Sequence, residues 1–177
     1  MAFSRKILAW SFYDWANSAF ATTVMAGFFP VFFKQYWAAD LTVTDSTFWL
    51  GAANSAASLV VVILAPILGA IADRASAKKR FLFVFTLLGV LMTGALSMVA
   101  AGFWVLAVAV YVFGILGFSG SNVFYDALLV DVAAPRQYER VSALGYALGY
   151  LGGGILFAFD VLMTVNPHWF GLADSAE

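Results

Sequence analysis

The sequence contains no cysteine and a single histidine, His168. The lack of cysteine excludes disulfides, thiolate chemistry and cysteine-bound metals. Charged residues are also scarce, at 11% of the chain, whereas soluble domains carry roughly a quarter. The chain is instead 63% hydrophobic, with a mean hydropathy of +0.91. A water-soluble fold could not bury so much apolar surface, so the composition indicates a protein embedded in the lipid bilayer.

Five apolar stretches each reach the length of about 20 residues that a helix needs to cross a bilayer. They cover residues 7–33, 48–72, 81–101, 103–130 and 141–165. The sequence therefore predicts an all-α membrane protein, with residues 1–177 forming a single transmembrane domain of five helices. The third stretch is nearly uniform in apolarity, and we expect it to face lipid.

The basic residues predict the orientation of these helices. If the N-terminus is cytoplasmic, every one of the nine basic residues except Lys34 falls on the cytoplasmic side. Such an excess of Lys and Arg in cytoplasmic segments is the positive-inside pattern of membrane proteins. We therefore expect a cytoplasmic N-terminus.

Polar side chains gather on the first and fourth predicted helices, with spacings that place them on one face of each helix. They are Ser11, Asp14, Asn17, Ser18 and Thr22 on the first, and Ser119, Asn122, Tyr125 and Asp126 on the fourth. Polar groups are costly in hydrocarbon and normally face a bundle interior or a wet cavity. We expect a path for a substrate or for protons to be lined by Asp14, Asn17, Ser18, Thr22, Ser119 and Asn122. An alternative for Asp14 is that it pairs with a basic loop residue and anchors its helix.

The fifth helix carries glycines at intervals of four residues, namely Gly145, Gly149 and Gly153. A stripe of small residues lets another helix backbone approach closely. We expect these three glycines to serve helix packing.

The sequence shows no cluster of histidines and acids with metal-ligand spacing and no nucleophile–base pair. It also lacks a glycine-rich phosphate-binding loop. We therefore expect no enzymatic activity, no metal and no cofactor, and no nucleic-acid partner. A non-transporting membrane scaffold is an alternative, although polar stripes inside two helices argue against it, since a scaffold needs no wet interior.

The loop after the second helix reads "GAIADRASAKKR" and resembles the signature loop of the major facilitator superfamily. The matching positions are Gly69, Asp73, Arg74, Lys78 and Lys79. Ser76 stands where that family usually has glycine. The superfamily carries this motif between its second and third helices, on the cytoplasmic side, as expected here. The resemblance implies a cytoplasmic gate in which Asp126 joins a charge cluster, with Arg74 or Lys78 as its partner.

Three further segments resemble the vacuolar-effluxer branch of that superfamily, which includes autophagy-linked fungal amino-acid exporters and bacterial relatives. They are "YDWANSAF", "FYDALL" and "RVSALGYALGYLGGG". The resemblance implies a secondary carrier of small solutes that works by alternating access. It implies an amino acid as substrate and the bacterial inner membrane as location. The residues themselves leave sugars, peptides and drugs open.

The superfamily has six helices in each of two halves, whereas this sequence supplies five. We expect the chain to be an N-terminal fragment that lacks a sixth helix and a second half, so that its partner is the missing C-terminal half of the carrier. The rival interpretation is a complete five-helix protein that acts as an oligomer.

Overall fold

The computed structural model describes residues 3–74 and 77–172, without the side chains of residues 72–74. Its contacts divide the chain into two units, which we describe separately. The first unit comprises Met1–Phe28 and Glu139–Glu177, and the second comprises Phe29–Tyr138. Within the described residues, five helices are long and apolar enough to cross a membrane, which confirms the predicted fold class. They cover Arg5–Trp37, Val43–Ile71, Lys78–Leu96, Trp104–Val132 and Pro135–Val165.

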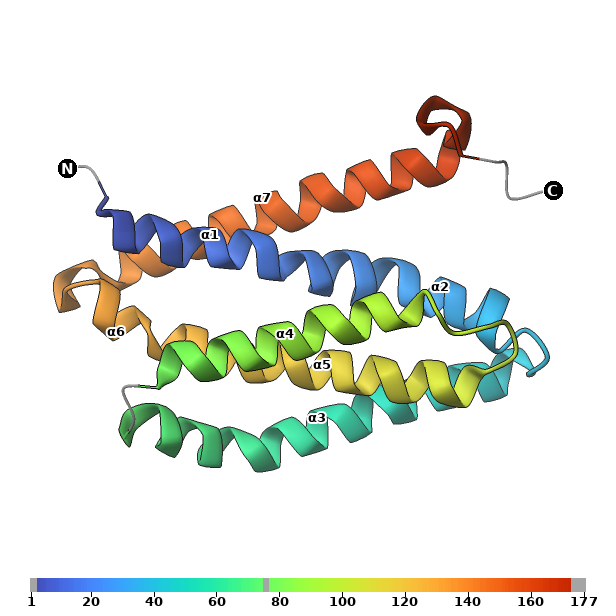
Figure 1. Ribbon diagram of the computed structural model, residues 1–177, viewed down its shortest axis with the longest axis horizontal. Coiled ribbons are helices and arrows are strands. Elements are labelled where there is room, and N and C mark those ends of the chain that lie inside the picture. The colour runs from blue at the N-terminus through green and yellow to red at the C-terminus, as the bar shows by residue number, and fades with distance from the viewer. Residues whose placement is uncertain (1–2, 75–76, 173–177) are drawn as a thin grey trace. The chain divides into compact units, whose positions relative to one another are not determined.

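In the first unit, α1 (Arg5–Ala19) runs beside α7 (Tyr138–Val165), which is followed by the short helix η4 (Pro167–Phe170) (Figure 1). α1 begins at Ser4, whose side-chain oxygen accepts a hydrogen bond from the Ile7 N–H at 3.3 Å. This N-cap satisfies one of the amide groups that the first turn of a helix leaves unpaired. α1 therefore starts two residues before the apolar stretch from which it was predicted.

The first membrane-spanning helix is not α-helical throughout. After α1 it continues as the π-helix η1 (Phe20–Phe28), then as α2 (Phe29–Phe32) and the π-helix η2 (Phe33–Trp37). Pro30 lies within this stretch and lacks the N–H that a regular helix would use. π-helical turns are rare and occur frequently at functional sites. Apolar periodicity predicted only a plain helix over residues 7–33.

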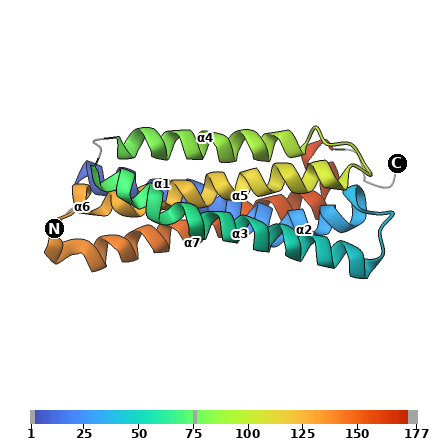
Figure 2. The same cartoon turned by 90° about the horizontal axis from the view of Figure 1, so that it is seen from below.

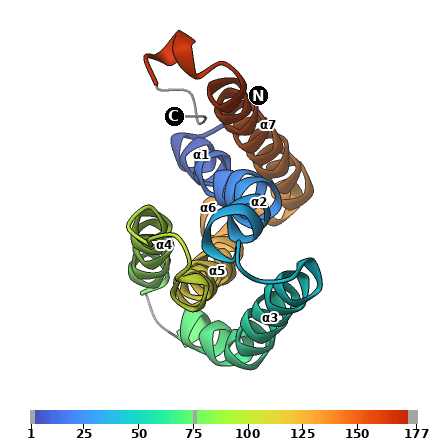
Figure 3. The same ribbon diagram turned by 90° about the vertical axis from the view of Figure 1, so that its right-hand side faces the viewer.

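The second unit contains three long helices: α3 (Val43–Arg74), α4 (Lys78–Leu96) and α5 (Trp104–Ala127). α5 lies between α3 and α4, as Figures 2 and 3 show. The short helices α6 (Leu129–Val132) and η3 (Pro135–Gln137) follow it. This central position explains why α5 carries the largest set of buried residues among the helices described.

Aromatic side chains form part of the core of the second unit. The Phe29 ring stacks on the Tyr111 ring with 3.6 Å between centroids and an interplanar angle of 8°. The Tyr111 hydroxyl donates a hydrogen bond to Oδ1 of Asn54 at 3.1 Å, which joins α5 to α3. Tyr111 is fully buried, so this hydrogen bond satisfies its one polar group away from solvent.

The expectation that the helix in 81–101 simply faces lipid is incomplete. Gly89 of α4 is buried, and a Cβ added to Gly117 of α5 would lie 2.7 Å from the Gly89 Cα. The two backbones therefore touch, as small residues allow. Only the far side of α4, with Val84 and Val90, is exposed. α4 also ends at Leu96, because a turned segment follows that includes Gly102 at a φ of +82°.

Candidate functional site

Three of the polar side chains predicted on the first helix form a continuous row along α1 and η1. The Ser18 hydroxyl donates a hydrogen bond to Oδ1 of Asp14 at 3.3 Å. One turn further, the Thr22 hydroxyl donates to the Ser18 carbonyl at 3.1 Å. The spacing of four residues stacks these side chains on one face of the helix.

The glycines of α7 lie directly against this row. A Cβ added to Gly149 would lie 2.8 Å from Oδ2 of Asp14 and 2.7 Å from Oγ of Ser18. A Cβ added to Gly153 would lie 2.7 Å from Oγ1 of Thr22. Real Cβ atoms essentially never come within 3.0 Å of other heavy atoms, so only glycine permits this approach. The third predicted glycine of this set, Gly145, is buried on the same helix.

Sequence analysis did not single out Gly152 of this contact. A Cβ on Gly152 would collide with the carbonyl oxygen of Trp15, so Gly152 belongs to the same close approach. Gly152 falls outside the spacing of four that identified the other glycines. Ser11, which was predicted on the polar face of the first helix, is fully buried, and its hydroxyl has no hydrogen-bond partner among the described residues.

Asn17 has a partner outside the row. Its Oδ1 accepts a hydrogen bond from the Tyr13 hydroxyl at 3.4 Å. At 3.6 residues per turn, Asn17 is about 60° around the helix from Asp14. That Asn17 lines the same path as the Asp14 row stays a prediction.

The polar residues predicted on the fourth helix, Ser119 and Asn122, lie on α5 in the second unit, and both are partly exposed. Between them, Ser121 is fully buried and donates to the Phe118 carbonyl at 2.7 Å. The polar residues of α1 and those of α5 belong to different units. That they line one shared path stays a prediction.

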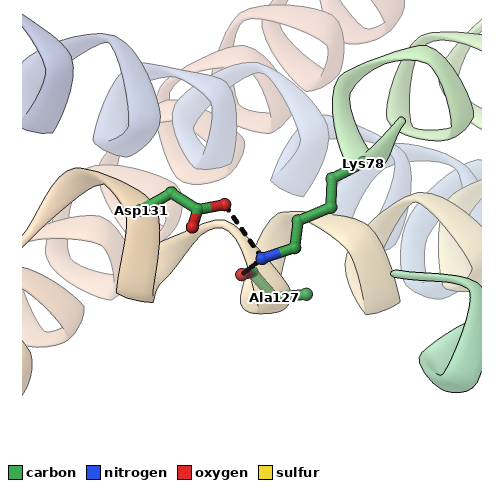
Figure 4. Close-up of polar contacts among 3 residues, drawn as sticks. All are labelled: Lys78, Ala127 and Asp131. Atoms are coloured by element: carbon green, nitrogen blue, oxygen red, sulfur yellow. Dashed lines mark hydrogen bonds and ion pairs between the residues drawn. The ribbon is translucent and has the colours of Figure 1, made fainter. Parts of the chain in front are cut away.

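The predicted cytoplasmic loop contains an ion pair that the sequence did not assign. Lys78 Nζ lies 2.9 Å from Oδ2 of Asp131 and donates to the Ala127 carbonyl at 3.0 Å (Figure 4). Ala127 is the last residue of α5, where the helix leaves carbonyl groups unpaired. A cation there also complements the negative end of the helix dipole. The carboxylate that contacts Lys78 is thus Asp131, whereas the sequence suggested Asp126.

The other residues of the loop motif are only partly described. The side chains of Asp73 and Arg74 lie outside the described residues, so a pairing of Arg74 with Asp126 stays a prediction. Asp126 is exposed near the end of α5. Lys79 is exposed, and a Cβ on Gly69 would meet no atom within 4 Å. The sequence did not indicate Asp131, because it lies beyond the apolar stretch, in the short helix α6. No periodic pattern there predicts a contact with α4.

The described residues form neither a metal site nor a polar pocket elsewhere in the second unit. Among residues 3–74 and 77–172, no group of three or more His, Cys, Asp and Glu side chains comes together to hold a metal. A crevice between α3, α4 and α5 is lined by apolar residues such as Val61, Leu116 and Val123. It offers no side-chain hydrogen-bond donor or acceptor to a polar solute. The Asp14 row is therefore the candidate polar site.

The chain is similar to several known proteins. Residues 41–137, more than half of the chain, match the family described as "Vacuole effluxer Atg22 like". An uncharacterized MFS-type transporter of Bacillus subtilis, YxiO, is 39% identical over 164 residues, which cover 92% of this chain and 38% of YxiO. An uncharacterized protein of Aquifex aeolicus is 27% identical over 167 residues, which cover 94% of this chain and 41% of that protein.

No solved structure matches the chain significantly. The chain spans about two fifths of the length of the two relatives. The match to the family covers α3, α4 and α5, which contain the loop motif, and the similarity to YxiO extends over nearly all five helices. The chain belongs to the Atg22-like vacuole effluxer family and is homologous to an MFS-type transporter.

Proposed function

We propose that this chain is part of a secondary active transporter that moves small solutes by alternating access. The observation that carries the proposal is the row of Asp14, Ser18 and Thr22 inside a membrane-spanning helix. A polar row with a carboxylate is expensive in a bilayer and is typical of substrate and ion pathways. Membership of a family with MFS-type transporters supports this interpretation.

The row also favours a carrier over a membrane scaffold. A scaffold gains nothing from an acid in hydrocarbon, and an apolar residue at position 14 would insert at a lower free-energy cost. In a carrier, Asn17 together with Ser119 and Asn122 would extend the polar lining of the pathway. The proposed substrate class is amino acids, which rests on the resemblance to amino-acid exporters.

The proposed orientation places the N-terminus in the cytoplasm, and the proposed membrane is the bacterial inner membrane. The loop between α3 and α4 would then lie at the cytoplasmic side and form part of a gate with Asp126. The Lys78–Asp131 pair supports this role, because it ties the start of α4 to the end of α5. A gate needs helix ends that move together as a rigid body. The Lys78–Asp131 ion pair links two such helix ends.

The proposal is tested by solute flux in proteoliposomes that hold the carrier containing this chain. We expect saturable flux of at least one amino acid and none in protein-free vesicles. Panels of sugars, short peptides and cationic drugs identify the substrate if amino acids are not moved. A well-folded carrier that moves no solute of any class would contradict the assignment and favour a scaffold.

A further inference from the structure

The second unit carries an apolar crevice that the proposed solute pathway does not use. Its floor includes Gly120 and Val123 of α5, and its sides include Ala65 and Leu68 of α3 and Phe85 of α4. The Phe85 ring lies against Gly120, where an added Cβ would collide with it, so the α4 side of the crevice is closed. Every lining residue is apolar, so a hydrated solute would find no hydrogen-bonding side chain there.

The dimensions of the crevice decide what can enter it. Along α3 it runs from Val61 to Leu68, which is about 10 Å at 1.5 Å per residue. It holds about 250 Å³ of space including its open mouth. A helix of about 10 Å diameter would need roughly 800 Å³ over the same length. A further membrane-spanning helix is therefore too thick to enter the crevice, whereas a single hydrocarbon chain is not.

Apolar side chains also flank the crevice. Ile67, next to Leu68 on α3, and Val84, next to Phe85 on α4, are both exposed. The helices that carry them are long and apolar enough to span a bilayer. A gap between apolar side chains forfeits dispersion contacts with the atoms that line it. A flexible acyl chain from the surrounding bilayer regains those contacts.

Two cations lie near the crevice where α4 begins. Lys79 and Arg80 precede Phe85 by about 9 and 7.5 Å along the helix axis, and both are exposed. Among the side chains that the structure describes, neither forms an ion pair, because the acid Asp131 binds their neighbour Lys78. The first turn of α4 contains no acid. The spanning helix begins at Lys78, so both cations lie at the depth of the lipid headgroups.

We propose that the crevice between α3, α4 and α5 binds one acyl chain of an anionic phospholipid, whose phosphate contacts Lys79 and Arg80. Basic residues at the membrane surface attract anionic headgroups, and the guanidinium of arginine matches a phosphate with two parallel hydrogen bonds. The inference does not rest on the proposed function, since a carrier and a scaffold could hold such a lipid equally. It assigns a second site, in the unit that does not contain the Asp14 row.

Native mass spectrometry of the purified carrier that contains this chain tests the site, because the mass identifies the bound lipid. The carrier is titrated with dioleoyl phosphatidylglycerol and, separately, with dioleoyl phosphatidylcholine, which has the same chains and no net charge. We expect the first phosphatidylglycerol to bind at least about tenfold more tightly, which corresponds to about 1.4 kcal/mol. Equal affinities for the two lipids would overturn the contact between headgroup and cations.

Two arginines provide a matched pair of variants for the headgroup. Arg80→Gln removes one cation beside the crevice, and we expect about fivefold weaker binding of phosphatidylglycerol with binding of phosphatidylcholine unchanged. Arg136 is also exposed, but it lies in η3 and does not line the crevice, so Arg136→Gln should change neither affinity by more than about twofold. Equal losses in both variants would indicate a general attraction to basic residues and overturn the site. Lys79→Gln replaces Arg80→Gln if the latter fails to accumulate.

Two alanines of α3 provide a matched pair for the acyl chain. Ala65→Leu fills part of the crevice, and we expect about fivefold weaker binding of both lipids, because it excludes the chain and leaves the cations in place. Ala70→Leu makes the same change at an exposed position outside the lining, and both affinities should stay within about twofold. Val61→Phe is the second filling variant if Ala65→Leu does not fold. Unchanged lipid binding in a folded filling variant would overturn the crevice as the chain site, as it would if the rest of the carrier covered the mouth.

The remaining outcomes separate this inference from an anion site and from the proposed function. If excess inorganic phosphate displaces phosphatidylglycerol, the two cations bind anions without the chain, and the lipid assignment is wrong. Solute flux in a carrier without any lipid preference would overturn this inference and leave the transporter assignment standing. A carrier that binds the lipid as expected but moves no solute would support the inference and contradict the transporter assignment.

Discussion

Lys78 Nζ contacts both Oδ2 of Asp131, at 2.9 Å, and the main-chain carbonyl of Ala127, at 3.0 Å. One ammonium group therefore joins the first residue of α4 to the C-terminal end of α5 and to α6. The Lys78 side chain is 17% exposed and that of Asp131 is 51% exposed. The hydrogen bond to the Ala127 carbonyl is therefore better shielded from solvent than the ion pair with Asp131.

This difference predicts unequal effects of two substitutions on stability. Asp131→Asn removes only the partly solvated ion pair, and we expect it to cost no more than about 1 kcal/mol. Lys78→Met also leaves the Ala127 carbonyl without its donor, so it should cost more than Asp131→Asn. Thermal unfolding of the purified carrier measures both variants and the double variant. If Asp131→Asn lowers the stability as much as Lys78→Met does, the hydrogen bond to the Ala127 carbonyl contributes nothing to stability.

The glycine contact between α1 and α7 predicts a position-specific loss of stability. Gly152→Ala places a methyl group on the Trp15 carbonyl, where the obstacle is backbone and cannot rotate away. Overpacking of this kind costs about 1–3 kcal/mol. We expect a lower melting temperature in detergent for Gly152→Ala, and none of this loss for Gly154→Ala. A Gly152→Ala carrier as stable as the wild type would contradict the close approach.

The hydrogen bond between Tyr111 and Asn54 predicts a small, defined effect. Tyr111→Phe keeps the ring that stacks on Phe29 and removes only the hydroxyl. Interhelical hydrogen bonds in membranes average about 0.6 kcal/mol and reach about 1.7 kcal/mol. We expect a loss in this range by thermal unfolding, with membrane accumulation unchanged. Asn54→Ala combined with Tyr111→Phe should cost less than the sum of the single variants.

Cysteine labelling tests the proposed orientation. The sequence has no cysteine, so single substitutions give a clean background. Gln137→Cys should react with impermeant thiol reagents only from the cytoplasmic side. Ala39→Cys and Ala101→Cys, which replace exposed residues, should react only from outside. Labelling of Gln137→Cys from outside the cell would contradict the proposed orientation.

Length and apolarity alone predicted the five helices, because a bilayer admits only long apolar segments with internally paired backbones. The same signal could not predict the π-helices around Pro30, since a π turn and an α turn have the same composition. Nor could it predict that Asp131 contacts Lys78, because that contact joins residues 53 positions apart on different elements. Spacing identified Gly149 and Gly153, but their alignment with Asp14 and Thr22 needed the structure.

The most direct test of the account compares wild-type carrier with Asp14→Asn in proteoliposomes, once a transported solute is known. The variant keeps the size of the side chain and removes its charge. We expect the wild type to accumulate solute against a gradient when a proton gradient is supplied. Asp14→Asn should reach the membrane normally and exchange solute across it, yet fail to accumulate it. Accumulation by Asp14→Asn at the wild-type rate would contradict a role of Asp14 in the proton pathway of the carrier.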